Sequence, residues 1–166
     1  AKPVFVDIKE DDFNMNSAEL KKKITKKTRA IIIVHIYGNP ADIVEISKVA
    51  KKNKVYLIED CSQAHGAEFN KKKVGTFGDL SCFSFYPTKN LSTFGDAGIV
   101  CTKNKKMFKK IKFFREYGWK KKNIGVSEGY NKRLDELHAG ILNVKLDNID
   151  KFNKKRILNA NKFLNL

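Results

Sequence analysis

Two short stretches of the chain carry side chains that could take part in catalysis. The first follows an apolar run ending at Ile58 and contains Asp60 and Gln63, and the second contains Ser84 and Lys89. An acid directly after a strand is well placed to meet a ligand, although the same position also suits a helix N-cap or a salt bridge. A lysine in a loop punctuated by proline and glycine is usually a solvated surface residue. Neither stretch is informative alone.

Taken together, these residue types match the needs of pyridoxal phosphate. That cofactor requires a lysine to form a Schiff base and an acid to keep its pyridine nitrogen protonated. It also requires hydroxyl or amide groups for its phosphate and a polar or flat group against its ring. Lys89, Asp60, Ser84 and Gln63 supply these types from two strand ends. A cleft at a sheet edge would desolvate the lysine enough to make it a nucleophile near neutral pH.

The elements that must position these residues alternate between strand-like and helix-like patterns. Apolar runs predict strands at 4–8, 30–34, 55–58, 80–85 and 99–101. Between them, Ile43, Ile46, Val49 and Ala50 form one stripe of a helix that ends near Asn53. This order predicts an α/β fold with a mainly parallel sheet and helices on both faces. Ligands of such sheets bind beyond the carboxyl ends of the strands.

Three further local signals help to place the elements. Asn16 with Glu19 resembles a capping box, and Asn39-Pro40 predicts an N-cap followed by proline at the first helical position. The glycine-containing segment 118–129 is predicted to be a mobile loop.

The composition excludes several function classes. The net charge is +16, but the lysines lie in scattered triplets without interleaved aromatic residues, and arginine is scarce. We interpret this charge as solvated lysine-rich faces, which makes a nucleic-acid-binding module a distant alternative. The sequence contains no run of 18 or more apolar residues, so we expect no helix that spans a membrane. The three cysteines form no Cys-x-x-Cys pair, so we expect no metal site and reduced thiols in a cytoplasmic protein.

Four stretches together resemble one family of proteins. Residues 34–40, 58–67, 83–98 and 129–142 are similar, in that order, to the DegT-type nucleotide-sugar aminotransferases. The resemblance covers almost the whole chain, and four ordered motifs are far more specific than one short pattern. It implies a fold-type I pyridoxal-phosphate enzyme that builds amino sugars, as in surface-polysaccharide or antibiotic biosynthesis.

The resemblance also implies residue roles. Asp60 would pair with the pyridine nitrogen, Gln63 would lie against the ring or its 3-hydroxyl, and Ser84 would bind the phosphate. Lys89 would form the Schiff base. Asn131 would reach the phosphate of the cofactor in the neighbouring subunit, which implies a homodimer with shared active sites. The family usually has glutamine at the position of His138, so this histidine is assigned no role.

The family pattern extends beyond this sequence at both ends. Its members carry an upstream Gly-Thr turn that grips the phosphate and a small C-terminal domain, and neither has a counterpart here. We therefore expect residues 1–148 to be a partial cofactor-binding large domain. Residues 149–166 would begin the connection to a missing C-terminal domain.

The implied reaction transfers an amino group from glutamate or glutamine to a nucleotide-linked keto-deoxy sugar. Residues 85–98 and 133–136 look more like members that aminate 3-keto sugars than like those acting on 4-keto sugars. A 4-keto aminotransferase and a regulatory relative that keeps the cofactor without turnover remain alternatives. A sugar dehydratase of the family would have histidine in place of Lys89.

Overall fold

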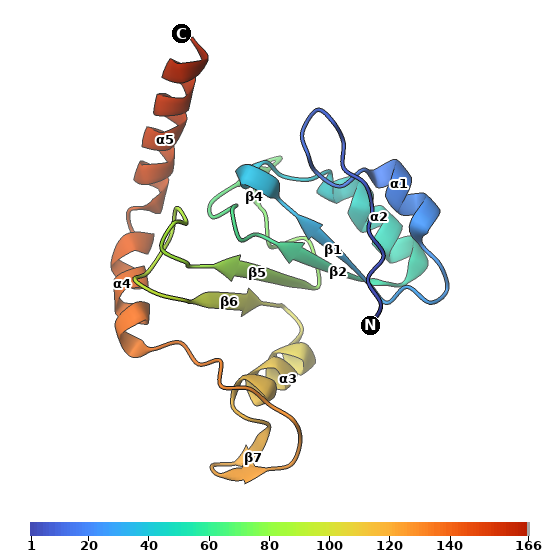
Figure 1. Cartoon of the computed structure of the whole chain (residues 1–166), viewed down its shortest axis with the longest axis vertical. Helices are drawn as coiled ribbons and strands as arrows, with labels where there is room; N and C mark the ends of the chain where they lie inside the picture. Colours follow the sequence, from blue (N-terminus) through green and yellow to red (C-terminus); the bar gives the residue numbers. More distant parts are fainter. Residues whose placement is uncertain (166) are drawn as a thin grey trace.

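The computed structural model describes residues 1–165, which are built around a four-stranded sheet of order β1-β2-β5-β6 (Figure 1). Strands β1 (Ala30–Val34), β2 (Tyr56–Asp60) and β5 (Leu80–Ser84) are parallel, and β6 (Gly98–Cys101) runs antiparallel to β5. The predicted α/β class with a mainly parallel sheet is therefore confirmed.

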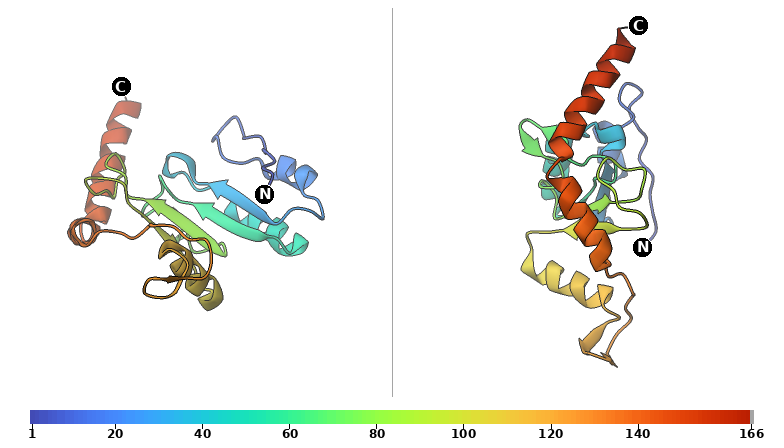
Figure 2. Two further views of the ribbon diagram at one scale, coloured as in Figure 1. Left: turned by 60° about the horizontal axis from the view of Figure 1, so that its bottom comes forward. Right: turned by 90° about the vertical axis from the view of Figure 1, so that its left-hand side faces the viewer.

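Five helices and two small hairpins surround this sheet within the described residues. The helices are α1 (Ser17–Lys23), α2 (Ile43–Asn53), α3 (Lys105–Arg115), α4 (Glu136–Leu146) and α5 (Ile149–Leu164), with a 3-10 turn η1 (Ile36–Gly38) after β1. The hairpins pair β3 (Glu68–Phe69) with β4 (Lys72–Lys73), and β7 (Trp119–Lys121) with β8 (Ile124–Gly125). Helices α4 and α5 run along one side of the molecule, and the end of α5 projects away from the sheet (Figure 2). Across residues 1–165, each helix is too short or too polar to span a membrane.

The main core lies between one face of the sheet and helices α1 and α2. The predicted stripe Ile43, Ile46, Val49 and Ala50 is buried, and α2 ends at Asn53 as expected. These side chains pack with Ile31, Ile33, Leu57 and Leu20. Each fully buried aliphatic side chain contributes about 1.5–3 kcal/mol of stabilisation, so this cluster fixes the positions of β1 and β2.

The opposite face of the sheet is open at β1 and β2. Ile32, Val34 and Tyr56 are exposed there, because alternate side chains of a strand point to opposite faces. A continuous apolar run such as 30–34 is typical of a strand buried on both faces, whereas residues 1–165 supply helix cover to only one face of these two strands.

Of three local predictions, the cap at Asn16 was correct, whereas the strand at 4–8 and the cap at Asn39 were wrong. Asn16 caps α1 through bonds from the N–H groups of Ala18 and Glu19. The strand predicted at 4–8 is absent: only an isolated bridge joins Ile8 to Met15, and the segment pairs with no strand of the sheet. Helix α2 begins at Ile43 rather than at Pro40, because the side chain of Asp42 caps it by accepting from the N–H of Glu45.

The carboxylate of Glu59 is fully buried and links three segments. It accepts hydrogen bonds from the N–H groups of Gly75 (2.6 Å), Phe77 (2.8 Å) and Gly78 (2.6 Å), and its Oε2 lies 3.1 Å from Nε2 of His35. Nδ1 of His35 accepts from the N–H of Ala41, which leaves Nε2 as the donor to Glu59. Burial acts to raise the pKa of Glu59, yet these donors together hold it below its ordinary value.

We expect Glu59→Gln to lower the free energy of unfolding by about 3 kcal/mol or more, because an amide cannot accept from all of these donors and leaves buried groups unpaired. Urea unfolding of the protein and its variant measures this. The matched control is Glu68→Gln, which removes an exposed ion pair with Lys73 and should change stability by less than about 0.5 kcal/mol.

The pH dependence gives a second measure of the same carboxylate. Because its folded pKa lies below the unfolded value of about 4.3, its stabilising contribution is present above that value and is lost as the pH falls through the folded pKa. The difference in stability between the protein and Glu59→Gln should therefore shrink as the solution is acidified. A difference that is independent of pH would contradict an ionised Glu59.

Candidate active site

The loops that follow β1, β2 and β5 meet at one edge of the sheet, because parallel strands end on the same side. They border a cavity of about 550 Å³ whose fourth wall is α5. Its lining comprises Tyr37, Gly38, Gln63, Ala64, His65, Gly66, Ala67, Thr88, Lys89, Asn90, Asn153, Arg156 and Ile157. The cavity lies where the fold class predicts ligand binding, and it contains two of the predicted site residues, Gln63 and Lys89.

Lys89 is half-buried in the loop between β5 and β6. Its N–H donates to the carbonyl of Tyr86 (2.9 Å), which closes a turn. The base of the loop is held by Phe85, whose N–H donates to Ala97 and whose carbonyl accepts from Thr93. Phe85 also packs with Leu91 and Leu142 of α4. The lysine therefore stands on a fixed support and is partly removed from water.

Gln63 is oriented by the backbone that follows β1. Its Oε1 accepts from the N–H of Tyr37 at 2.9 Å, so its amide nitrogen is left to donate elsewhere. Tyr37 and Gly38 both have left-handed backbones (φ 57° and 81°), and a Cβ on Gly38 would lie 3.1 Å from the carbonyl oxygen of Gln63. The close approach of the two loops therefore favours glycine at position 38.

Asp60 and Ser84 end their strands beside the cavity without lining it. Asp60 pairs in register with Val34 and Cys82, two residues before Ser84 on the neighbouring strand. Oδ1 of Asp60 accepts from the N–H of Ser62 at 2.9 Å, and no partner within residues 1–165 occupies its Oδ2. Ser84 accepts from the N–H of Tyr86 through its Oγ at 3.3 Å. One Asp60 oxygen and the Ser84 hydroxyl proton are thus left for a ligand.

Asn131 is not brought to this cavity. It is exposed in the connection between β8 and α4, where it forms an isolated bridge with Glu116. A role toward a neighbouring subunit, as the resemblance implies, stays a prediction.

Two side-chain hydrogen bonds of Asn153 fasten helix α5 to the cavity, and a third joins their partners to each other. Nδ2 of Asn90 donates to the carbonyl of His65 (2.9 Å) and to Oδ1 of Asn153 (3.0 Å), while Nδ2 of Asn153 donates to the same carbonyl (3.0 Å). We call these three residues the amide clasp. It joins the residue after Lys89 to a helix that lies 63 positions further along the chain.

Burial keeps two side chains uncharged: His65, which lines the cavity, and Cys61. The ring of His65 packs against Phe83 and Phe85, and burial lowers its pKa, an effect that the charge of Lys89 reinforces. Burial and the charge of Glu59 raise the pKa of Cys61, which keeps this thiol protonated.

His35, Glu59 and Cys61 form a buried group whose ligand atoms lie within 4.8 Å of one another. The first two are already engaged: both ring nitrogens of His35 are hydrogen-bonded, and the Glu59 carboxylate accepts three N–H groups. Their bonding is that of a structural network, and we assign it no metal.

The sequence matches a family model along almost its whole length. The model is that of the DegT/DnrJ/EryC1/StrS aminotransferase family, and residues 1–165 match it. The chain belongs to this family. The resemblance inferred from the four motifs is therefore confirmed.

Two named relatives show what the chain is similar to. The chain is 44% identical over 156 residues to a pleiotropic regulatory protein of Geobacillus stearothermophilus, with 94% of this chain and 42% of that protein covered. It is 43% identical to a UDP-N-acetyl-3-dehydro-alpha-D-glucosamine 3-aminotransferase of Acidithiobacillus ferrooxidans, with coverages of 94% and 42%. The chain thus spans less than half the length of these relatives.

Solved structures of family members share the fold. Streptomyces venezuelae DesV, solved with a ketimine intermediate, superposes with a TM-score of 0.93 at 36% identity, covering 98% of this chain and 44% of that one. Escherichia coli GDP-4-keto-6-deoxy-D-mannose-3-dehydratase, solved with hydrated PLP, gives 0.89 at 29% identity, covering 97% and 46%.

Several residues of the site were not expected from the sequence. Asn90 and Asn153 form the clasp, and Tyr37 orients Gln63 through its backbone. Asn153 carried no signal, because an asparagine in the middle of a basic helix resembles any solvated residue. Tyr37 has a positive φ, which is usual for glycine or asparagine but not for tyrosine, so its residue type did not predict this backbone conformation.

We expect Gly66→Ala to break the amide clasp. Gly66 has φ +84°, and a Cβ there would lie 2.7 Å from Nδ2 of Asn153, so the Asn153 side chain must move out of the clasp. Backbone strain and one lost hydrogen bond should destabilise the protein by about 1–3 kcal/mol. Hydrogen exchange of the α5 amides should accelerate more than that of β1 and β2.

Gly140→Ala in α4 is the control, because nothing lies within 4 Å of its added Cβ. It should leave α5 exchange unchanged and stabilise the protein by about 0.5–1 kcal/mol through helix propensity. Equal acceleration in the two variants would contradict the clasp.

Proposed function

We propose that this chain is the cofactor-binding part of a pyridoxal-phosphate-dependent aminotransferase that aminates a nucleotide-linked keto-deoxy sugar. The observation that carries the proposal is the cavity at the carboxyl edge of the sheet, lined by half-buried Lys89 and by Gln63 with its amide nitrogen unengaged. Family membership supports the reaction class, and of two related structures one was solved with a ketimine intermediate and the other with hydrated PLP.

The residues at this edge have the donor and acceptor types that pyridoxal phosphate requires. Asp60 has one carboxylate oxygen free for a pyridinium N–H, and Gln63 has an amide N–H free for a ring oxygen. The hydroxyl of Ser84 suits a phosphate. The bound cofactor supplies a ring that withdraws electrons from the Cα of the amino donor.

In this proposal Lys89 moves the proton. With the cofactor bound, its amine would act as the base that accepts the proton of the donor's Cα and as the acid that returns it. Asp60 would hold the ring nitrogen protonated. The turn closed by the Lys89 N–H and the packing of Phe85 on Leu91 and Leu142 fix the backbone that carries this amine.

The names of the relatives favour a 3-keto sugar. Proteins 43% and 37% identical to this chain are named as a sugar 3-aminotransferase and as a dTDP-3-amino sugar transaminase. We propose glutamate or glutamine as the amino donor and a cytoplasmic homodimer in which Asn131 serves the partner's cofactor. Incubating the full-length protein with 3-keto and 4-keto nucleotide sugars and each donor, followed by mass spectrometry of the products, tests this.

A regulatory role is the second candidate, because the chain is 44% identical to a protein named as a pleiotropic regulator. A regulatory role predicts that the protein binds the cofactor but aminates none of the 3-keto and 4-keto nucleotide sugars.

Lys89→Ala should abolish covalent attachment of the cofactor. Borohydride reduction followed by peptide mapping should label Lys89 in the unchanged protein and no lysine in the variant. Lys103→Ala, at an exposed position after β6, should keep the label. Label on another lysine would overturn the assignment.

Asp60→Asn should retain bound cofactor but slow the half-reaction with the amino donor by orders of magnitude, since an amide does not hold the ring nitrogen protonated. Its oxygen can still accept from Ser62, so the local structure should survive. Single-turnover absorbance measurements give the rate. Asp147→Asn, an exposed residue after α4, should be unaffected. A nearly unchanged rate in Asp60→Asn would assign the ring nitrogen to another partner.

A further inference from the structure

We propose that Arg156 of α5 binds the carboxylate of the amino-acid donor. This inference rests on the proposed function, and it adds a substrate-binding residue that none of the sequence motifs contains. It follows from the position of α5, the charges that line the cavity and the geometry of the donor.

The amide clasp brings Arg156 to the cavity. Asn153 is bonded to His65 and Asn90, and Arg156 lies three residues further along α5, on the same side of the helix. Asn153, Arg156 and Ile157 all line the cavity that contains Lys89. The position of the guanidinium group is thus coupled to that of the lysine loop.

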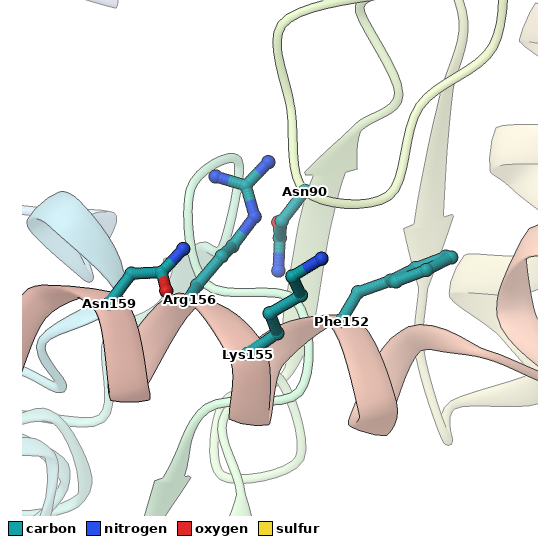
Figure 3. Close-up of a pocket in the computed structure, with 5 residues that line it drawn as sticks. All are labelled: Asn90, Phe152, Lys155, Arg156 and Asn159. Carbon is teal, nitrogen blue, oxygen red and sulfur yellow. The ribbon is translucent and has the colours of Figure 1, made fainter.

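Arg156 also borders a second, smaller hollow. It has a volume of about 210 Å³ and lies between Asn90 and α5, lined also by Phe152, Lys155 and Asn159. Figure 3 shows the side chains of Arg156 and Lys155 extending from α5 toward the loop that carries Asn90. Arg156 borders both hollows, whereas Lys155 borders only the smaller one.

Arg156 forms no ion pair with the described part of the chain. Within residues 1–165 no carboxylate oxygen lies within 4.0 Å of its guanidinium nitrogens, although other basic residues form such ion pairs. The cavity is lined by two cationic side chains, Lys89 and Arg156, and by no Asp or Glu. Such a cavity attracts anions, and the planar guanidinium matches a carboxylate through two parallel hydrogen bonds.

The amino donor brings a carboxylate to this place. The α-carboxylate of the donor is attached to the same carbon as the amino group that reacts beside Lys89. The carboxylate and the amino group must therefore enter the same cavity. The phosphates of a nucleotide sugar are separated from the reacting carbonyl by the sugar ring. A cation that shares the cavity with the lysine therefore fits the donor carboxylate better than the sugar's phosphates.

The test uses the full-length protein loaded with pyridoxal phosphate. Calorimetry measures binding of glutarate, an unreactive dicarboxylate, and single-turnover absorbance measures the concentration dependence of the half-reaction with glutamate. Arg156→Gln should raise the Kd for glutarate and the half-saturating concentration of glutamate by about 10- to 100-fold, because a charge-assisted pair is lost. Arg156→Lys, which keeps the charge but not the planar fork, should give an intermediate loss. The KM for the nucleotide sugar should stay within about twofold.

Lys155→Gln is the matched control, because it removes one positive charge from the same helix without changing the lining of the larger cavity. It should bind glutarate like the unchanged protein. Unchanged glutarate binding in Arg156→Gln, or an equal loss in Lys155→Gln, would overturn the proposal. So would a change confined to the KM of the nucleotide sugar.

The design separates this proposal from the proposed function. If the unchanged protein takes no amino group from any donor, the proposed function fails, whereas glutarate binding that depends on Arg156 would still identify the anion site. If catalysis proceeds but is indifferent to Arg156, only the present inference fails. Arg156→Lys provides the readout should Arg156→Gln misfold, which circular dichroism detects.

Discussion

The arrangement of the site depends on a buried carboxylate that takes no part in the proposed chemistry. Glu59 receives three backbone N–H groups and the ring of His35, and thereby joins the end of β2 to the segment 75–78 and to the residue after β1. An unpaired charge at this depth would be strongly destabilising, so these segments are held together wherever the carboxylate is ionised. The strand ends that carry the cavity are fixed by this network.

Glu59 and Asp60 are consecutive acids with opposite surroundings. Successive side chains of β2 point to opposite faces of the sheet, so Glu59 enters the core while Asp60 faces the open side. The same alternation leaves Ile32 and Val34 exposed beside Asp60. The division between a structural acid and a candidate catalytic acid is therefore a consequence of strand geometry.

Much of the fold and two residues that line the candidate cavity could be predicted from the sequence. The stripe of α2 and the central strands follow from hydrophobic periodicity, and the rule that ligands bind beyond the strand ends led to Asp60, Gln63 and Lys89. The strand expected at 4–8 failed because pairing requires a neighbour, which local composition does not reveal. The cap expected at Asn39 failed because Asp42 competes for the same helix start. Asn153 and Arg156 could not be found, since their significance comes from contacts across 63 residues of sequence or from a cavity shared with distant loops.

The triplet lysines at 21–23, 71–73 and 120–122 are all exposed, as solvated faces require.

The amide clasp couples two asparagines from distant parts of the chain, because both donate to one acceptor, the carbonyl oxygen of His65. Rotation of α5 that withdraws Asn153 removes a partner from Asn90 as well as from that oxygen. The helix and the lysine loop are therefore mechanically coupled: any force that tilts α5 is transmitted to the backbone beside Lys89.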